Sequence, residues 1–566
     1  MRSFTVSAPA QQREPLDLTF NSSKEAFKCK YTSELVRAYL VYQICSINFI
    51  VEKNEMLMKR SRKVLGKRLF EMVMKATFYG QFVAGEDPEK IKPVIDRLSA
   101  FGVKSILDYS VEEDIPTEEA EDSEMKAMRS SLGDKREDGQ LVQFHAEKSF
   151  ADRRKMKPQA RTYFYKNEAA CEKNLEHFLM SIHAVHNATK GRGLMAVKLT
   201  ALGRPQLLMQ LSEVIMRARV YMEGIDGTKG NVLTHHKSQE DLIRYMSKIK
   251  DNPDVTEFLK RMTTDKKGVV HLFPWSELMD KDMNLSETFR VPDFKTGQMR
   301  RLISQISKEE EQMFRNMLRR MKILIQEAQK MDVRVMIDAE QTYFQPAISR
   351  LTMELMRQYN KEKMLVFNTY QTYLKNSYNE IVADLEQAQR QNFYWGAKCV
   401  RGAYLEQERA RASAMGYDDP TNPNFDATTA SFHKCLREVV TRFKGENKGR
   451  LAVMVASHNE DTVRFSIELM KEMNIKPEQK VICFGQLLGM CDHVTFPLGQ
   501  AGYSAYKYLP YGPVVEVLPY LSRRANENRG FLAKVQKEKR LLLKEILRRV
   551  LSGQVFHKPV GKYTPA

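Results

Sequence analysis

Eight short runs with the composition of β-strands, separated by stretches of helical periodicity, constrain the fold of this chain more than any other feature. The runs span residues 103–109, 194–200, 333–338, 364–370, 394–401, 451–457, 481–485 and 503–508. Several follow one another at intervals of about thirty residues, the size of a strand–helix–strand unit. This pattern predicts an α/β protein with a (β/α)8 barrel, and an open doubly wound sheet is the alternative.

The stretches outside these units predict how the chain is divided. We expect a helical N-terminal region over 1–98, the first two strands within 99–204 and a helical insertion over 205–330. Residues 331–535 would complete the barrel with a final helix, and 536–566 would form a basic C-terminal helix and tail. A chain of 566 residues is long enough for one large core with such appendages.

Polar side chains gather where the predicted strands end. They are Asp108, Lys198, Asp338, Glu340, Tyr370, Gln371, Arg401, Tyr404, His458, Asn459, Gln486 and Tyr508. In a (β/α)8 barrel the strand ends form one mouth, so these side chains would converge on one ligand. Any one of them is also a common turn residue, and for His458 alone we favour that role. Together they predict a binding site.

Two adjacent arginines, Arg523 and Arg524, follow the last predicted strand. The residues after Pro513 have helical periodicity, although Pro519 would kink that helix or mark its true start. Because guanidinium groups match carboxylate or phosphate, the pair predicts a clamp for a small acid. An exposed basic helix end, with Glu527 paired to Arg523, is an equal alternative.

Two kinds of chemistry fit such a mouth. Lys198 on an apolar strand could form a Schiff base, and Asp338, Glu340 and His458 could bind a metal, as in a lyase or hydrolase. One strand-end histidine is few for a metal site. The many Lys, Arg, Gln and Tyr residues better fit a large phosphorylated cofactor together with a small carboxylate.

Charge and cysteine content leave the partner open. The chain has 90 Lys and Arg residues against 71 Asp and Glu, a net charge of +19, which allows nucleic acid, an anionic membrane or an acidic ligand. No basic stripe interleaved with aromatic residues is visible, so we do not expect nucleic-acid binding. The seven cysteines are scattered without C-x-x-C spacing, and neither a disulfide framework nor a zinc site is predicted.

Membrane signals in the sequence are weak. No segment is long and apolar enough to predict a transmembrane helix, and the first thirteen residues fit only a short remnant of a mitochondrial transit peptide. Near the C-terminus an apolar stripe with basic flanks consists of Leu543, Ile546, Leu547 and Val550. Packing of this stripe on the barrel is the favoured explanation, and an interfacial membrane helix is the alternative.

Several motifs, all in order between residues about 100 and 535, resemble the mitochondrial proline dehydrogenase (proline oxidase) family. They are Ala196–Gly203, Ile337–Glu340, Arg401–Tyr404, Ser457–Asn459, Gly485–Met490, Tyr508 and Tyr520–Asn528. The resemblance implies a distorted (β/α)8 barrel with noncovalent FAD that oxidises L-proline to Δ1-pyrroline-5-carboxylate, by hydride transfer from C5 to flavin N5. It also implies transfer of electrons to ubiquinone, by a peripheral protein on the matrix side of the inner mitochondrial membrane.

The resemblance also assigns roles in substrate binding. It implies that Arg523, Arg524 and Lys198 bind the proline carboxylate, and that Tyr404, Leu487 and Tyr508 wall the pyrrolidine ring. Asp338 would organise the pocket beside Lys198, and Glu527 would orient Arg523. Asp108 and Glu112 would close the pocket opposite the flavin.

The remaining motif positions are implied to contact FAD. They are Gln371, Lys398, Arg401, Gly402, Ala403, His458 and Asn459. Positive charge among them suits a pyrophosphate. A close relative of the family oxidises 4-hydroxyproline and carries a small residue where this chain has Tyr508, so the resemblance favours proline as the substrate.

Overall fold

The computed structural model describes residues 13–109, 165–189, 193–226, 253–261, 263–264, 270–271, 285–293, 298–302, 306–443, 449–530 and 532–566. The chain divides into two compact units. The first unit comprises Met1–Glu112, His183–Met195 and Met454–Ala566, and the second comprises Glu113–Ile182 and Ala196–Val453. The domain boundaries expected from the sequence are a different division and stay a prediction.

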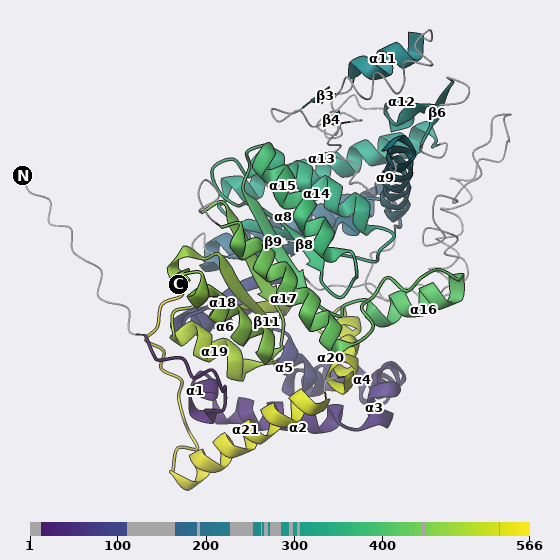
Figure 1. Ribbon diagram of the computed structural model, residues 1–566. Coiled ribbons are helices and arrows are strands. Elements are labelled where there is room, and N and C mark those ends of the chain that lie inside the picture. The colour runs from purple at the N-terminus through teal and green to yellow at the C-terminus, as the bar shows by residue number, and fades with distance from the viewer. Residues whose placement is uncertain are drawn as a thin grey trace, which may run out of the picture. The chain divides into compact units, whose positions relative to one another are not determined.

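Eight strands form one closed barrel in the order β1-β12-β11-β10-β9-β8-β7-β2 (Figure 1). The strands are β1 Val103–Tyr109, β2 Leu194–Val197, β7 Arg334–Ile337, β8 Val366–Gln371, β9 Trp395–Val400, β10 Leu451–Ala456, β11 Ile482–Leu487 and β12 Ala505–Tyr511. Every residue of β8 is buried, as expected of a parallel strand that is covered by helices outside and packed inside. The predicted (β/α)8 barrel is confirmed, and the open sheet is wrong.

The strand ends differ most from the prediction in β2, β11 and β12. β2 ends at Val197 because residues Leu199–Ala201 form a 3-10 turn, which leaves Lys198 at the strand exit as predicted. β11 and β12 continue farther than predicted. Gln486, which was predicted to follow its strand, and Tyr508, which was predicted to end its strand, therefore both lie inside strands. The reason is that β12 pairs with β1 along its whole length, and this pairing continues past Tyr508.

In the first unit, helices from before and after the barrel pack in one apolar core. The helices before the barrel are α1 Ser23–Phe27, α2 Thr32–Cys45, α3 Asn48–Glu52, α4 Asn54–Ala76, α5 Phe78–Phe82 and α6 Pro88–Ala100, and those after it are α20 Leu518–Gly530 and α21 Leu532–Leu551. Buried side chains from both groups pack together, among them Leu35, Tyr42, Phe82, Leu521 and Leu542. This burial of apolar area holds α20 and α21 to the N-terminal helices.

The other helices follow the barrel strands or lie in the insertion. They are α8 Glu168–Thr189, α9 Pro205–Asp226, α11 Pro253–Arg261, α12 Leu285–Thr288, α13 Lys308–Lys330, α14 Gln345–Tyr359, α15 Ser377–Arg390, α16 Leu405–Met415, α17 Phe425–Thr441, α18 Glu460–Glu472 and α19 Asp492–Gln500. Between β2 and β7 the structure has the predicted helices and two unpredicted ribbons, β3 Thr263–Thr264 with β4 Val270–His271 and β5 Arg290–Pro292 with β6 Met299–Arg301. Runs of two or three residues are too short to show a strand period.

The structure decides two predictions near the C-terminus. α20 begins at Leu518 and not at Pro513, so the predicted alternative in which Pro519 marks the true start of the helix is confirmed. The predicted packing of the apolar stripe is wrong. Along α21 the packed face includes Leu541, Leu542, Glu545 and Arg549, whereas Leu543, Leu547 and Val550 of the predicted stripe are exposed. Only Ile546 of that stripe contacts the core. Among the described helices, none is both long and apolar enough to span a bilayer.

Candidate active site

Strand exits in the second unit carry a buried ion pair. The Lys398 ammonium of β9 meets the carboxylate of Asp338, the residue after β7. The backbone amide of Asp338 donates to the Val197 carbonyl oxygen (2.9 Å), so the exit of β7 is fixed next to that of β2, where Lys198 follows. The sequence predicted Asp338 beside Lys198 and placed Lys398 among cofactor contacts. In the structure Asp338 is the ion-pair partner of Lys398.

Glu340 joins three strand exits. Its carboxylate accepts the Thr200 hydroxyl at 2.9 and 3.0 Å, and its carbonyl oxygen accepts the Gln371 side-chain amide at 2.8 Å. Burial raises the pKa of the Glu340 carboxyl to about 7, against the opposing effects of Lys198 and the Thr200 hydrogen bonds. Sequence analysis noted Glu340 at a strand end and considered it only as a metal ligand in the lyase or hydrolase alternative. Its proximity to Asp338 in the Asp-Ala-Glu motif was the available signal.

Gln371 and Tyr404 are held by a shared neighbour. The Tyr373 hydroxyl donates to the Gln371 side-chain oxygen and accepts the backbone amide of Tyr404 at 3.2 Å. Tyr404 is buried immediately before α16. Both polar ends of the Gln371 amide therefore already have protein partners, which makes Gln371 an organiser of these strand exits. Its contact with FAD stays a prediction.

Arg401, Gly402 and Ala403 form a turn after β9. The Arg401 guanidinium lies 4.3 Å from the centre of the Phe425 ring and donates to the Thr429 hydroxyl at 3.0 Å. Gly402 has φ +81°, and a Cβ there would meet no atom within 4 Å. Gly402 and Ala403 are exposed. The turn thus presents a cation and open backbone to its surroundings.

His458 and Asn459 follow β10 in the first unit. The Leu487 amide donates to His458 Nε2 at 3.1 Å, so this ring nitrogen acts as a hydrogen-bond acceptor. The Asn459 side-chain oxygen caps α18 by accepting the Asp461 amide at 2.9 Å. The Asn459 amide nitrogen is buried without a hydrogen-bond partner among the described residues. Such a donor fits an acceptor on a bound molecule.

A fully buried lysine supports the exit of β11. The Lys507 ammonium donates to the carbonyl oxygens of Met490 (2.5 Å) and Leu487 (3.2 Å) and pairs with Asp492 (2.8 Å). Burial alone would raise the pKa of the Asp492 carboxyl, but Lys30 and Lys507 hold it below its usual value. Sequence analysis missed Lys507, although a lysine inside an aromatic strand was an available signal.

The two predicted carboxylate-binding arginines lie on α20. Arg524 is buried and Arg523 half-buried, and their guanidinium carbons lie 4.8 and 5.8 Å from the centre of the Tyr520 ring. Tyr520 precedes them by four and three residues, so all three side chains share one face of the helix. Only the backbone of Glu527 is described, and its link to Arg523 stays a prediction.

The structure thus groups the predicted residues by unit. Lys198, Asp338, Gln371, Lys398, Arg401, Gly402, Ala403 and Tyr404 lie in the second unit, and Asp108, His458, Asn459, Leu487, Tyr508, Arg523 and Arg524 in the first. Asp108 lies near the end of β1, and Glu112 is outside the described residues. Among the described side chains, no group of three or more His, Cys, Asp or Glu residues is placed to hold a metal ion.

Comparison with known proteins identifies the family. The family profile described as proline dehydrogenase matches residues 92–537. "Proline dehydrogenase 1, mitochondrial" of Drosophila melanogaster is 60% identical over 99% of this chain and 84% of its own length. The human protein of that name is 47% identical over 95% and 91%. "Hydroxyproline dehydrogenase" of Bos taurus is 33% identical over 93% and 92%.

One solved structure supports the fold. Proline utilization A from Bdellovibrio bacteriovorus, inactivated by N-propargylglycine, aligns with a TM-score of 0.51 at 15% identity, over 94% of this chain and 39% of that chain. At this identity the likeness concerns the fold alone. The profile match extends over most of the sequence and the curated relatives align along nearly all of it. This chain belongs to the proline dehydrogenase family.

Proposed function

We propose that this protein oxidises L-proline to Δ1-pyrroline-5-carboxylate with noncovalently bound FAD, the first step of proline catabolism. The main support for this proposal is the family match over residues 92–537, a range that contains all the predicted substrate and cofactor contacts. Four relatives named proline dehydrogenase are 44–60% identical to this chain, and four named hydroxyproline dehydrogenase are 31–33% identical. This difference favours proline.

Three cations are proposed to bind the substrate carboxylate: Arg523, Arg524 and Lys198. Neutralising this carboxylate makes loss of the neighbouring ammonium proton easier, because the negative charge that held the proton is compensated. From the neutral amine, the C5–H bond breaks and a C5=N bond forms. Two electrons leave with the C5 hydrogen as hydride, and a second proton leaves from nitrogen.

Apolar contacts are proposed to fix the ring. Tyr404, Leu487 and Tyr508 would hold the pyrrolidine ring with C5 presented for hydride loss, which converts the reaction into a positioned step within one complex. Leu487 and Tyr508 are partly buried, and Tyr404 is buried. Such side chains also exclude water from the reacting carbon.

The residues present fit FAD. Lys398, Arg401 and His458 would contact its phosphates and flavin ring, and the open Gly402 backbone allows close approach. The Asn459 amide nitrogen, which has no hydrogen-bond partner in the described part of the chain, can donate to it. Gln371 and Ala403 complete the proposed set. FAD supplies the acceptor for the hydride when bound.

An apolar and basic surface supports the proposal of peripheral membrane contact. We propose ubiquinone as the electron acceptor. Helices α2, α3, α4 and α21 lie together in the first unit (Figure 1) and expose large apolar side chains, including Leu40, Phe49, Val64, Met72 and Leu547. Basic residues intersperse them along α4: Lys59, Arg60, Arg62, Lys63, Lys67, Arg68 and Lys75. Such a surface suits an anionic bilayer. With relatives named mitochondrial, we propose the matrix side of the inner mitochondrial membrane.

An absorbance spectrum of the purified protein tests the proposal. We expect a yellow protein whose flavin absorbance bleaches on addition of L-proline. A colourless protein that forms a borohydride-trapped adduct or requires an added metal would instead indicate a Schiff-base or metal-dependent lyase. A yellow protein that bleaches only with 4-hydroxyproline would indicate a hydroxyproline dehydrogenase.

A further inference from the structure

The segment that connects β11 to α19, residues 488–492, has an unusual backbone. Gly489 has φ +76°, and a Cβ there would lie 2.1 Å from the Gln81 carbonyl oxygen. Cys491 has φ +57°, a left-handed conformation that costs a residue other than glycine about 1 kcal/mol or more. A conformation of this kind persists only where surrounding contacts impose it.

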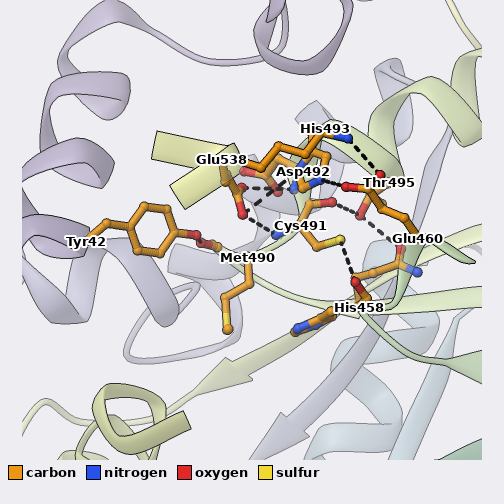
Figure 2. A network of polar contacts seen from close by, with 12 residues as sticks. Tyr42, His458, Glu460, Met490, Cys491, Asp492, His493, Thr495 and Glu538 are labelled. Atoms are coloured by element: carbon orange, nitrogen blue, oxygen red, sulfur yellow. Dashed lines mark hydrogen bonds and ion pairs between the residues drawn. The ribbon is translucent and has the colours of Figure 1, made fainter. Parts of the chain in front are cut away.

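Three helices outside the barrel supply those contacts. The Tyr42 hydroxyl of α2 and the Gln81 side-chain amide of α5 both donate to the Gly489 carbonyl oxygen at 2.7 Å. The Glu538 carboxylate of α21 accepts the backbone amides of Cys491 (2.9 Å) and Asp492 (3.2 Å), as Figure 2 shows. Tyr42, Gln81 and Glu538 are buried, so water does not readily replace them.

The same segment is attached to two predicted site residues. The Cys491 thiol is 3.8 Å from the His458 carbonyl oxygen, to which it donates, and Figure 2 shows this contact beside the His458 ring. Leu487, immediately before the segment, donates its amide to His458 Nε2. A displacement of the segment would therefore shift Leu487 and His458 together.

We infer that Glu538, Tyr42 and Gln81 are positioning residues of the active site, which fix the 488–492 segment and through it the Leu487 side chain and the His458 ring. The roles of Leu487 and His458 in this inference rest on the proposed function. The N-terminal and C-terminal helices thereby contribute to catalysis without touching substrate or cofactor, because small displacements of positioning groups lower the rate strongly.

Glu538→Gln is the sharpest test. It keeps the shape of the side chain but turns a donor toward one of the two backbone amides, so the segment loses one hydrogen bond and gains an unfavourable contact. Glu545→Gln is the matched control, because Glu545 is also buried on α21 and its carboxylate pairs with Arg548 and Arg549. Tyr42→Phe and Tyr39→Phe form a second matched pair on α2.

Activity is compared at a temperature at which the thermal unfolding curve of each variant shows that the protein is fully folded. We expect Glu538→Gln to lower kcat/KM for L-proline at least about tenfold more than Glu545→Gln, and Tyr42→Phe to act in the same direction relative to Tyr39→Phe. In a Leu487→Ala background Glu538→Gln should lower kcat/KM by a smaller factor than in the unmodified protein, because one of the two groups that it positions is gone. Additive losses, or equal losses in Glu538→Gln and Glu545→Gln, would overturn the inference.

Hydrogen–deuterium exchange of the peptide that contains residues 487–492 gives a readout independent of activity. Exchange should rise in Glu538→Gln and Tyr42→Phe and remain unchanged in the two controls. Unchanged exchange in Glu538→Gln would overturn the positioning role even if activity falls. Failure of the proposed function would appear differently, as an unmodified protein that does not oxidise proline while its exchange pattern still responds to Glu538→Gln.

Discussion

Leu487 and Tyr508 lie opposite each other on neighbouring strands of the barrel. They are register partners in the β11–β12 ladder, and the amide of Leu488 donates to the Tyr508 carbonyl oxygen at 3.0 Å. Register partners in adjacent strands project to the same face of a sheet. The two residues predicted to wall the pyrrolidine ring are therefore neighbours, which gives their joint role a structural basis.

Tyr508 should determine the choice between proline and trans-4-hydroxy-L-proline. A tyrosine ring against the pyrrolidine edge desolvates a 4-hydroxyl without a partner, which costs roughly 1–3 kcal/mol. We expect kcat/KM to favour L-proline at least about tenfold, and Tyr508→Ser to narrow this ratio mainly by losing activity on proline. Tyr508→Phe, which retains the ring, should keep the preference. Equal use of both substrates by the unmodified protein would disprove this role.

Arg523→Met and Arg524→Met should each raise KM for L-proline by about tenfold to a hundredfold, because a hydrogen bond to a charged group contributes about 1.5–3 kcal/mol. Flavin content should stay nearly unchanged, since the lost interaction is with the substrate carboxylate. Arg540→Met is the matched control, because Arg540 is exposed on α21. Steady-state kinetics with flavin quantification checks this. An unaltered KM in both variants would refute the carboxylate clamp.

Lys398 and Asp338 should show strong coupling in a double-mutant cycle. Their side chains are only 8% and 15% exposed, so removing one partner leaves a buried charge uncompensated, at a cost of about 3 kcal/mol or more. Lys398→Met and Asp338→Asn should each lower the free energy of unfolding, and the double variant should lose less than the sum. Urea unfolding measures all four proteins. Simple additivity would mean that the two side chains are not coupled, which would contradict this prediction.

Glu340 should make stability depend on pH. The carboxyl has a pKa of about 7 in the folded protein against 4.5 ordinarily, so between these values the folded state retains a proton that the unfolded state has lost. The raised pKa contributes about 3 kcal/mol to the free energy of unfolding below pH about 4.5. This contribution is lost as the pH rises to about 7. Urea unfolding of wild type and Glu340→Gln across this range tests it. A stability difference independent of pH between the two proteins would contradict the prediction.

Exposed side chains of α4 should contribute to vesicle binding. Replacing Val64 and Met72 by serine should weaken binding to vesicles with anionic phospholipid by at least about tenfold, since each buried apolar side chain contributes about 1.5–3 kcal/mol. The double variant Met180→Ser and Val220→Ser is the control, because these residues are exposed on α8 and α9. Sedimentation with vesicles measures binding, and soluble-dye reduction should persist. Equal binding by both double variants would exclude α4 from the interface.

Much of the barrel was predictable because each of its strands is recognisable from a few neighbouring residues in the sequence. Each strand is an apolar run between helical stretches, and Lys198, Asp338 and His458 follow their strands in the chain. The position of Arg523 and Arg524 on a helix after the last strand was also readable from periodicity. In each case the pattern lies within a few residues, and the packing of helices around a parallel barrel then follows from burial of that pattern.

The tertiary structure decided which residues, far apart in the sequence, supply the partners of buried charges and hydrogen-bonding groups. Periodicity showed that α21 is amphipathic but not which face is covered, because that depends on the N-terminal helices. Arg549 is fully buried there since Glu545 and the carbonyl oxygens of Phe27 and Lys30 satisfy its guanidinium.

Likewise, the pairing of Lys398 with Asp338 and the support of Cys491 by Glu538 depend on contacts between residues far apart in the chain. A buried charge or backbone amide must find a partner wherever the closed fold brings one, and the sequence around it carries no record of that partner. The sequence by itself therefore determined the barrel and its polar strand ends. Only the tertiary structure decided how those ends are held.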